Sequence, residues 1–145
     1  MREAEEDKNM GQHDAYGKLI LGRAAGRGYK YDGESTTTSY GDSSAHIDGV
    51  VGSFIAVEIE SRTGKQVRGA VLDLILHAFP KKLLILVPMY IGSHQVEECE
   101  FILKRFLSPN DFCVVLLSGT GDDPDEKGDI PKVQSALQAL GWKIG

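Results

Sequence analysis

The middle of the chain alternates between apolar and polar residues in a way that predicts two neighbouring β-strands. The segments 46–52 and 55–61 are rich in Val and Ile and are separated by a short Gly-Ser turn, a pattern typical of a hairpin. Alternate side chains of a strand share one face, so Glu58 and Glu60 point to the same side. Their apolar neighbours in the strand then point into the core.

The rest of the chain alternates between helical and buried-strand patterns. Apolar residues at helical spacing predict four helices, and continuous apolar runs predict two strands covered on both faces. The first predicted helix is 12–25, and the second is capped by Ser61 or Thr63 and stopped by Pro80. The third and fourth are capped by Ser93 and Asp129. The two predicted strands are 81–87 and 112–117. The predicted inner faces include Ala15, Leu19 and Ile20 in the first helix and Phe106 in the third.

Helices that separate strands require crossover connections, so the later strands should be parallel. The expected fold is therefore an α/β domain with a mixed sheet flanked by helices on both faces. Residues 1 to about 11 are acidic and polar and are predicted to be disordered, and residues 29–44 predict a loop with at most one irregular strand. A chain of 145 residues without a repeat or a long linker predicts one domain, residues 1–145.

Composition and charge limit the classes of function. The acidic N-terminus is not a secretory signal and the longest apolar run, 83–89, is too short to span a bilayer, so we expect a cytoplasmic protein with no membrane partner. Cys99 and Cys113 are expected to be reduced core residues, with a disulfide between them left open. A net charge of -5 argues against nonspecific coating of nucleic acid, although it does not exclude a nuclease.

Three carboxylates come together on the two predicted strands, because Asp48 joins Glu58 and Glu60. Neighbouring carboxylates repel each other, and a fold tolerates them best when a cation lies between them. Carboxylate oxygens are the ligands that Mg²⁺ prefers, so the pattern predicts a divalent-metal site. His46, two residues before Asp48, could line it. The alternative is a solvated strand face on which Lys or Arg side chains pair with Glu58 and Glu60.

These residues resemble the PD-(D/E)XK nuclease superfamily, the fold of many type II restriction endonucleases. The shared pattern is an Asp at the end of one strand and, about ten residues later, an acidic-X-Lys triplet on the adjacent strand. Asp48 takes the first position and Glu58 the acidic position, while Glu60 stands where most members carry lysine and Ile47 where the motif names proline. A minority of restriction enzymes have Glu or Gln at the lysine position. The resemblance covers roughly residues 45–117.

The resemblance implies a restriction-endonuclease-like domain that acts as a Mg²⁺-dependent endodeoxyribonuclease, with Mn²⁺ as a substitute. Asp48, Glu58 and the backbone carbonyl of Ile59 would hold the metal. Glu60 would orient the attacking water, accept its proton or hold a second metal. Lys65, at the start of the next helix, could supply the positive charge that the triplet lacks. The implied catalytic set is therefore Asp48, Glu58, Glu60 and Lys65.

The implied partner is DNA, and basic residues near the motif are candidates for contacts with it. These candidates are Arg62, Lys65, Arg68, Arg27 and Lys30. Cutting both strands usually requires two active sites, so a homodimer is expected. The Gly-rich segment 22–28 lacks the ending of a P-loop, and no nucleotide cofactor is expected.

Two other functions stay open from the sequence. The fold could be a noncatalytic module that binds nucleic acid or a protein, with Glu60 marking a degenerate site. It could instead bind a small ligand at the carboxyl ends of its parallel strands, near residues 88–92 and 118–121.

Overall fold

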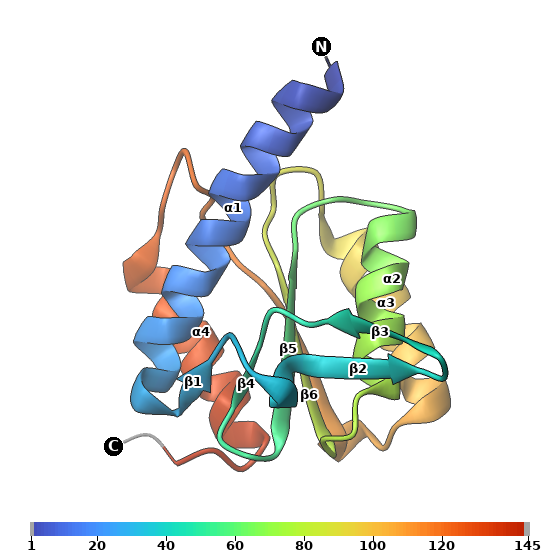
Figure 1. Ribbon diagram of the computed structural model, residues 1–145. Helices are drawn as coiled ribbons and strands as arrows, with labels where there is room; N and C mark the ends of the chain where they lie inside the picture. The colour runs from blue at the N-terminus through green and yellow to red at the C-terminus, as the bar shows by residue number, and fades with distance from the viewer. Residues whose placement is uncertain (1, 144–145) are drawn as a thin grey trace.

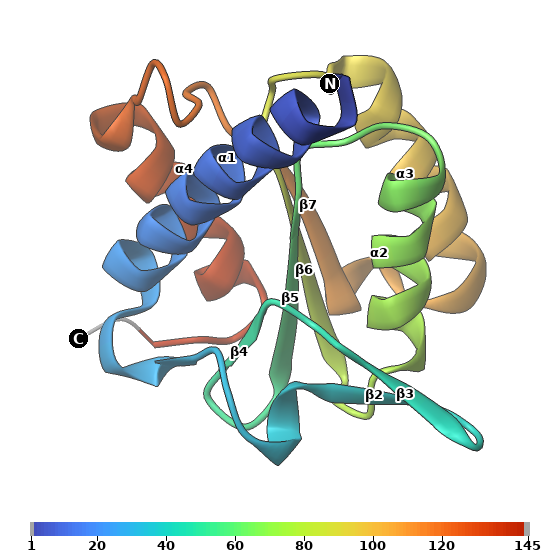
Figure 2. The same ribbon diagram turned by 45° about the horizontal axis from the view of Figure 1, so that its top comes forward.

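The computed structural model describes the backbone of residues 2–143 and the side chains of residues 11–143. The main sheet contains β1 (Tyr29–Lys30), β4 (Gly49–Val51), β5 (Ile55–Glu60), β6 (Lys81–Leu86) and β7 (Phe112–Leu116). The helices are α1 (Arg2–Ala25), α2 (Lys65–Leu76), α3 (Ser93–Phe106) and α4 (Glu126–Ala139). The chain folds as an α/β protein in which α1 and α4 cover one face of the five-stranded sheet and α2 and α3 cover the other (Figures 1 and 2). The predicted fold class is confirmed.

The sheet has the order β1-β4-β5-β6-β7. The predicted hairpin is confirmed, because β4 and β5 pair antiparallel, and the predicted parallel strands are confirmed, because β5, β6 and β7 run in the same direction. The last pair between β4 and β5 joins Gly49 to Val57. Strand β5 therefore continues past its partner, and Glu58, Ile59 and Glu60 lie along an edge that β4 leaves open.

Each face of the sheet has its own apolar core. Val57 and Ile59 pack with Ile20, Leu21 and other residues on the α1 and α4 side. On the opposite side the small Ala56 packs under α2 and α3. The carboxylates of Glu58 and Glu60 belong to the second face, yet both residues are only 7% exposed. The predicted alternation along this strand is thus correct, and it brings two acidic side chains into a largely buried layer.

The first helix differs from its prediction in length and in rotation. It begins at Arg2, so residues 2–11 extend the helix where the sequence predicts disorder. Acidic residues near a helix start interact favourably with the helix dipole, and the sequence contains no proline there. Ala15 and Leu19 are exposed, whereas Tyr16 and Ile20 are buried, because α1 rests on the sheet through Gly17.

The segment predicted as a loop contains a second, two-stranded sheet. After 3₁₀ turns η1 (Gly26–Gly28) and η2 (Glu34–Thr36), strands β2 (Thr37–Tyr40) and β3 (Ser43–His46) form an antiparallel hairpin. Its turn contains Gly41 with φ +78°, a conformation that suits glycine. The predicted strand 46–52 is consequently broken: β3 ends at His46, and Asp48 lies in the connection before β4.

Three predicted helix details are also corrected. Helix α2 begins after Gly64, because the Glu60 carboxylate binds the backbone N–H groups of Ser61 and Arg62 and keeps them out of the helix. Asp125 caps α4 instead of Asp129, which is buried one turn further along. Phe106 ends α3 and is 65% exposed, so it does not belong to the inner face.

Candidate functional site

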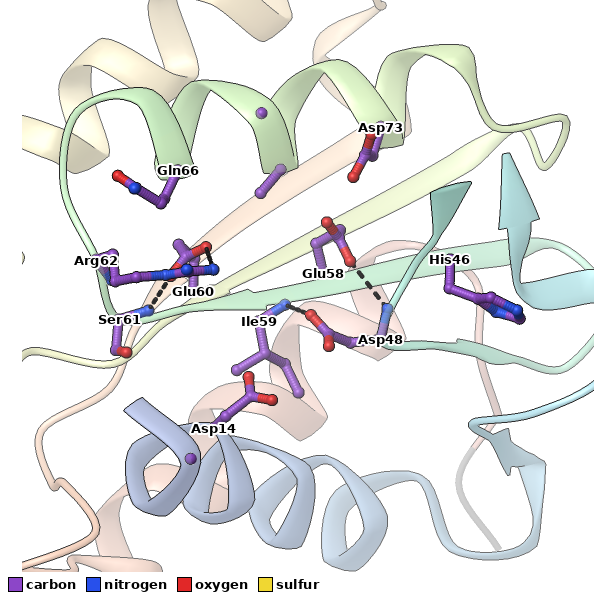
Figure 3. A pocket seen from close by; sticks show the side chains of 13 residues that line it. Asp14, His46, Asp48, Glu58, Ile59, Glu60, Ser61, Arg62, Gln66 and Asp73 are labelled. Atoms are coloured by element: carbon purple, nitrogen blue, oxygen red, sulfur yellow. Dashed lines mark hydrogen bonds and ion pairs between the residues drawn. The ribbon is translucent and has the colours of Figure 1, made fainter. Parts of the chain in front are cut away.

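A cavity of about 420 Å³ opens at the edge of the sheet where β5 runs past β4. Five carboxylates and one guanidinium line it, from α1, the β3–β4 connection, β5, the segment between β5 and α2, and the last turn of α2. These are Asp14, Asp48, Glu58, Glu60, Asp73 and Arg62, and we call them the carboxylate cleft. Figure 3 shows α1 on one side of β5 and α2 on the other, with the acidic side chains between them.

Asp48 and Glu58 are joined through the backbone. The N–H of Asp48 donates to Glu58 Oε1 at 2.9 Å, and the N–H of Ile59 donates to Asp48 Oδ2 at 2.7 Å (Figure 3). In a strand the N–H and C=O of one residue point to the same edge. The Ile59 carbonyl therefore faces the open edge beside the Asp48 carboxylate. The sequence predicts these three groups as one ligand set, and the fold brings them together.

Burial raises the pKa of both carboxyls of this pair. Burial, followed by the charge of Asp48, raises the pKa of Glu58 to about 10. Burial is also the main cause that raises the pKa of Asp48. Without a cation, Glu58 thus holds a proton at neutral pH, next to an Asp48 carboxyl whose own pKa is raised.

Glu60 is held by its neighbours in the chain. Its Oε2 accepts from the N–H groups of Ser61 and Arg62, both at 2.9 Å, and from Arg62 Nε at 3.0 Å. Its Oε1 accepts from Arg62 Nη2 at 3.1 Å. The positive charge next to the motif thus comes from Arg62. Lys65, predicted for that role, is an exposed first residue of α2 and does not line the cavity.

Asp14 is a cleft residue that the sequence analysis missed. Burial and then the charge of Asp48 raise its pKa to about 6, although Lys18 lies 3.7 Å away. The carboxylate reaches the cleft because Gly17, one turn later, lets α1 lie directly on β5. A Cβ at Gly17 would be 2.4 Å from Ile59 Cγ2. A glycine inside a helical pattern is the one sequence signal for this close approach.

Asp73 of α2 is the other cleft residue that the sequence analysis missed, and the β2–β3 hairpin binds it. The Tyr40 hydroxyl donates to the Asp73 carboxylate, and Thr38 Oγ1 donates to the Asp73 carbonyl at 3.2 Å. These bonds join β2 to α2 above the cleft. His46 lines the cavity as predicted, but from the end of β3, where its Nδ1 lies 3.1 Å from Thr36 Oγ1.

The basic residues predicted to contact DNA are spread over the molecule. Of these, Arg62 alone lines the cavity. Arg68 pairs with Glu98 of α3 at 3.3 Å. Arg27 and Lys30 are exposed in η1 and β1, beyond the C-terminal end of α1, whereas Asp14 lies in the middle of that helix. The fold therefore divides the predicted basic set between the cleft, the outer face of α2 and the far end of α1.

The donor atoms fit a hard cation with few protein ligands. Within residues 11–143, whose side chains are described, no group of three or more His, Cys, Asp or Glu side chains is arranged to hold a metal ion. Two carboxylates, Asp48 and Glu58, remain with the Ile59 carbonyl. Mg²⁺ prefers oxygen ligands and keeps several of its waters, so one or two carboxylates suffice for it.

The loop predicted as a small-ligand site is occupied by the protein itself. The N–H groups of Ser118 and Gly119 donate to the Asp129 carboxylate at 2.6 Å and 2.9 Å. The N–H of Gly121 donates to His13 Nδ1 at 3.0 Å. Because these donors are already bound, they are not available to a phosphate, which argues against the 118–121 part of the predicted site.

No family model, curated protein or solved structure matches the chain. The resemblance to the nuclease superfamily therefore depends on the motif residues and on the order of strands around them. Across the described part of the chain, every helix is too short or too polar to cross a membrane.

Proposed function

We propose that this chain is a metal-dependent endonuclease that hydrolyses DNA phosphodiester bonds, of the restriction type and acting as a homodimer. The observation that supports the proposal is the Asp48 and Glu58 pair beside the Ile59 carbonyl at the open edge of β5. Two buried neighbouring carboxyls gain from a divalent cation, because it stabilises the ionised form of both and offsets the repulsion between the two charges.

Each cleft residue has a role in this proposal. Mg²⁺ bound there would polarise a phosphoryl oxygen and lower the pKa of a water. Asp48 and Glu58 would hold the cation, with Glu58 in its deprotonated form. Asp14, with a pKa of about 6, is ionised at neutral pH and accepts a proton from the attacking water. Glu60 orients the guanidinium of Arg62, which is 44% exposed and can contact a phosphate.

Plasmid cleavage tests the proposal directly. The purified protein is incubated with supercoiled DNA and Mg²⁺ or Mn²⁺, beside EDTA and a Glu58→Ala variant. We expect metal-dependent nicking or cutting that the variant loses. The control is Glu98→Gln, which changes a carboxylate on α3 that pairs with Arg68 outside the cleft. Equal cutting by wild type and Glu58→Ala would refute the assignment of the site.

A noncatalytic module on the same fold is the second candidate. The observation that favours it is that Glu60 accepts four hydrogen bonds and takes no part in a ligand set with Asp48 and Glu58. Calorimetry with Mn²⁺ separates the two candidates. Binding that Glu58→Ala abolishes supports the nuclease, whereas no binding together with no cutting supports the module.

A further inference from the structure

A second cavity, of about 780 Å³, lies where α1 ends. Arg23, Arg27 and Lys143 line it together with Trp142 and Gly28, and we call this group the basic corner. Both ribbon views show the end of α1, β1 and the last part of the chain meeting at one corner of the molecule (Figures 1 and 2). The corner is separate from the carboxylate cleft, which opens beside the first half of α1.

The charges of the basic corner are mostly uncompensated. Arg23 lies 3.5 Å from Glu126 in a pair whose side chains are 61% and 42% exposed. No ion pair joins Arg27 or Lys143 to an acidic residue among residues 11–143. Three cations around one cavity, in a chain of net charge -5, make this corner a local site for an anion.

Trp142 forms a fixed aromatic wall of the cavity. Its ring lies directly on the backbone at Gly28, where a Cβ would be 2.2 Å from Cζ2, and close to Gly52. The Phe54 ring packs against it with a centroid distance of 6.4 Å. A rigid aromatic wall beside cations is the combination that binds an unpaired base and its phosphate. A duplex keeps its bases stacked inside and would offer this wall no base.

Two tyrosines, the half-buried Tyr29 and the exposed Tyr31, lie between the basic corner and the cleft. Tyr31 is 68% exposed, and its ring centroid lies 5.9 Å from that of Tyr29. The Tyr29 hydroxyl in turn donates to the Asp48 carbonyl at 3.3 Å. Lys30 lies between the two tyrosines in the chain and is exposed. The segment from Arg27 to Tyr31 thus contains two basic and two aromatic residues, and its Tyr29 reaches Asp48.

We propose that the basic corner binds single-stranded nucleic acid, with a base against Trp142 and phosphates on Arg27 and Lys143. This binding does not require the cleft to cut, so it goes beyond the proposed nuclease function.

Intrinsic fluorescence gives the first test, because Trp142 is the only tryptophan of the chain. The full chain in EDTA is titrated with an oligothymidine of about 12 nucleotides, a length within the site sizes known for single-strand binding. We expect a change in Trp142 emission that added salt reverses, as counterion release requires. A duplex of equal length should give a smaller change. An equal response to both would overturn the preference for single strands.

Variants locate the binding. Arg27→Ala and Lys143→Ala should each weaken binding of a labelled oligothymidine roughly 5- to 10-fold by anisotropy. Lys104→Ala, which removes an exposed lysine of α3, is the matched control and should leave the affinity unchanged. All three positions are exposed, and their melting temperatures verify the fold. Unchanged affinity in Arg27→Ala and Lys143→Ala, or no binding by the wild type, would overturn the proposal.

The two proposals fail separately. Glu58→Gln should keep single-strand binding in EDTA, because the basic corner contains no cleft residue. Single-strand binding without any metal-dependent cutting would support the proposal for the basic corner and refute the proposed nuclease function. Metal-dependent cutting with no single-strand binding in EDTA would support the nuclease function and refute the proposal for the basic corner.

Discussion

The carboxylate cleft and the basic corner both lie beside α1, but the charged groups of the cleft are mostly acidic and largely buried, whereas those of the corner are basic and exposed. In the cleft, Glu58 and Glu60 are 7% exposed, and burial raises the pKa of Asp14, Asp48 and Glu58. At the corner, the Arg23 side chain is 61% exposed and shares a long ion pair with Glu126. Buried like charges cost folding energy until a cation binds, whereas exposed charges cost little and act on a partner. This difference in burial is the basis of the two proposals, a cation site in the cleft and an anion surface at the corner.

After the loss of cutting expected for Glu58→Ala, the largest expected effect comes from Asp14, the cleft residue that α1 supplies. If it accepts the proton of the attacking water, Asp14→Asn lowers the cleavage rate on the order of 100-fold. Its pKa of about 6 adds a pH signature, because the carboxyl must be ionised to act as a base. The wild-type rate should rise with pH up to about 6 and then level off, and the variant should lose this rise. Asp122→Asn, in an exposed loop, is the control. An unchanged pH profile in Asp14→Asn would exclude the role.

The next effect tests how α1 reaches the cleft. Gly17→Ala places a Cβ 2.4 Å from Ile59 Cγ2, so α1 or Ile59 must shift, at a cost of about 1–3 kcal/mol. Gly11→Ala makes the same change in the same helix, with no atom within 4 Å of the new Cβ. It should stabilise the helix by up to about 1 kcal/mol. Urea denaturation of the two variants measures the difference. Equal stability would show that α1 is not held on β5 through Gly17.

A smaller effect concerns the proton that Glu58 holds. Its pKa lies at about 10 in the folded chain and near its ordinary 4.5 when unfolded, so folding binds a proton. This contribution is fully present below pH 4.5 and is lost as the pH rises toward 10. Glu58→Gln has no such proton to lose, and in EDTA its stability should fall less steeply between about pH 6 and pH 9. At pH 8 it should exceed the wild type by roughly 1–2 kcal/mol.

Thermal melts across that pH range provide the measurement, with Glu98→Gln as a control outside the cleft. Asp14 also binds a proton on folding, but its pKa of about 6 confines that contribution to lower pH. A saturating divalent cation should stabilise the wild type and leave Glu58→Gln unchanged. Parallel pH profiles of the two proteins would show that Glu58 is ionised in the folded state.

The sequence predicts the part of the cleft that depends on strand periodicity. The positions of Glu58 and Glu60 follow from alternation along β5, and the parallel order of β5, β6 and β7 follows from the intervening helices. Asp14 and Asp73 lie on helices whose rotation depends on tertiary contacts, such as that of Gly17 with Ile59. Periodicity within a helix does not fix that rotation when apolar residues such as Leu19 occur on its exposed face.

The basic corner could not be predicted from the sequence, because its residues meet only through tertiary packing. Arg23 and Arg27 follow one another near the end of the first helix, but Trp142 and Lys143 come from the opposite end of the chain. Their meeting depends on the packing of α1 against α4 and on Gly28, which leaves room for the indole ring. Neither contact has a local sequence pattern.

The smallest expected effect is on stability at the basic corner. Arg23→Gln removes an exposed pair with an N–O distance of 3.5 Å, and such pairs contribute about 0–1 kcal/mol. We expect a change within about 0.5 kcal/mol in urea denaturation at low salt, and none at high salt, where exposed charges are screened. The affinity for single-stranded oligothymidine should nevertheless fall, because Arg23 lines the cavity. Lost affinity with unchanged stability would separate the corner from the cleft, where charge and folding are coupled. A large loss of stability would instead give Arg23 a structural role.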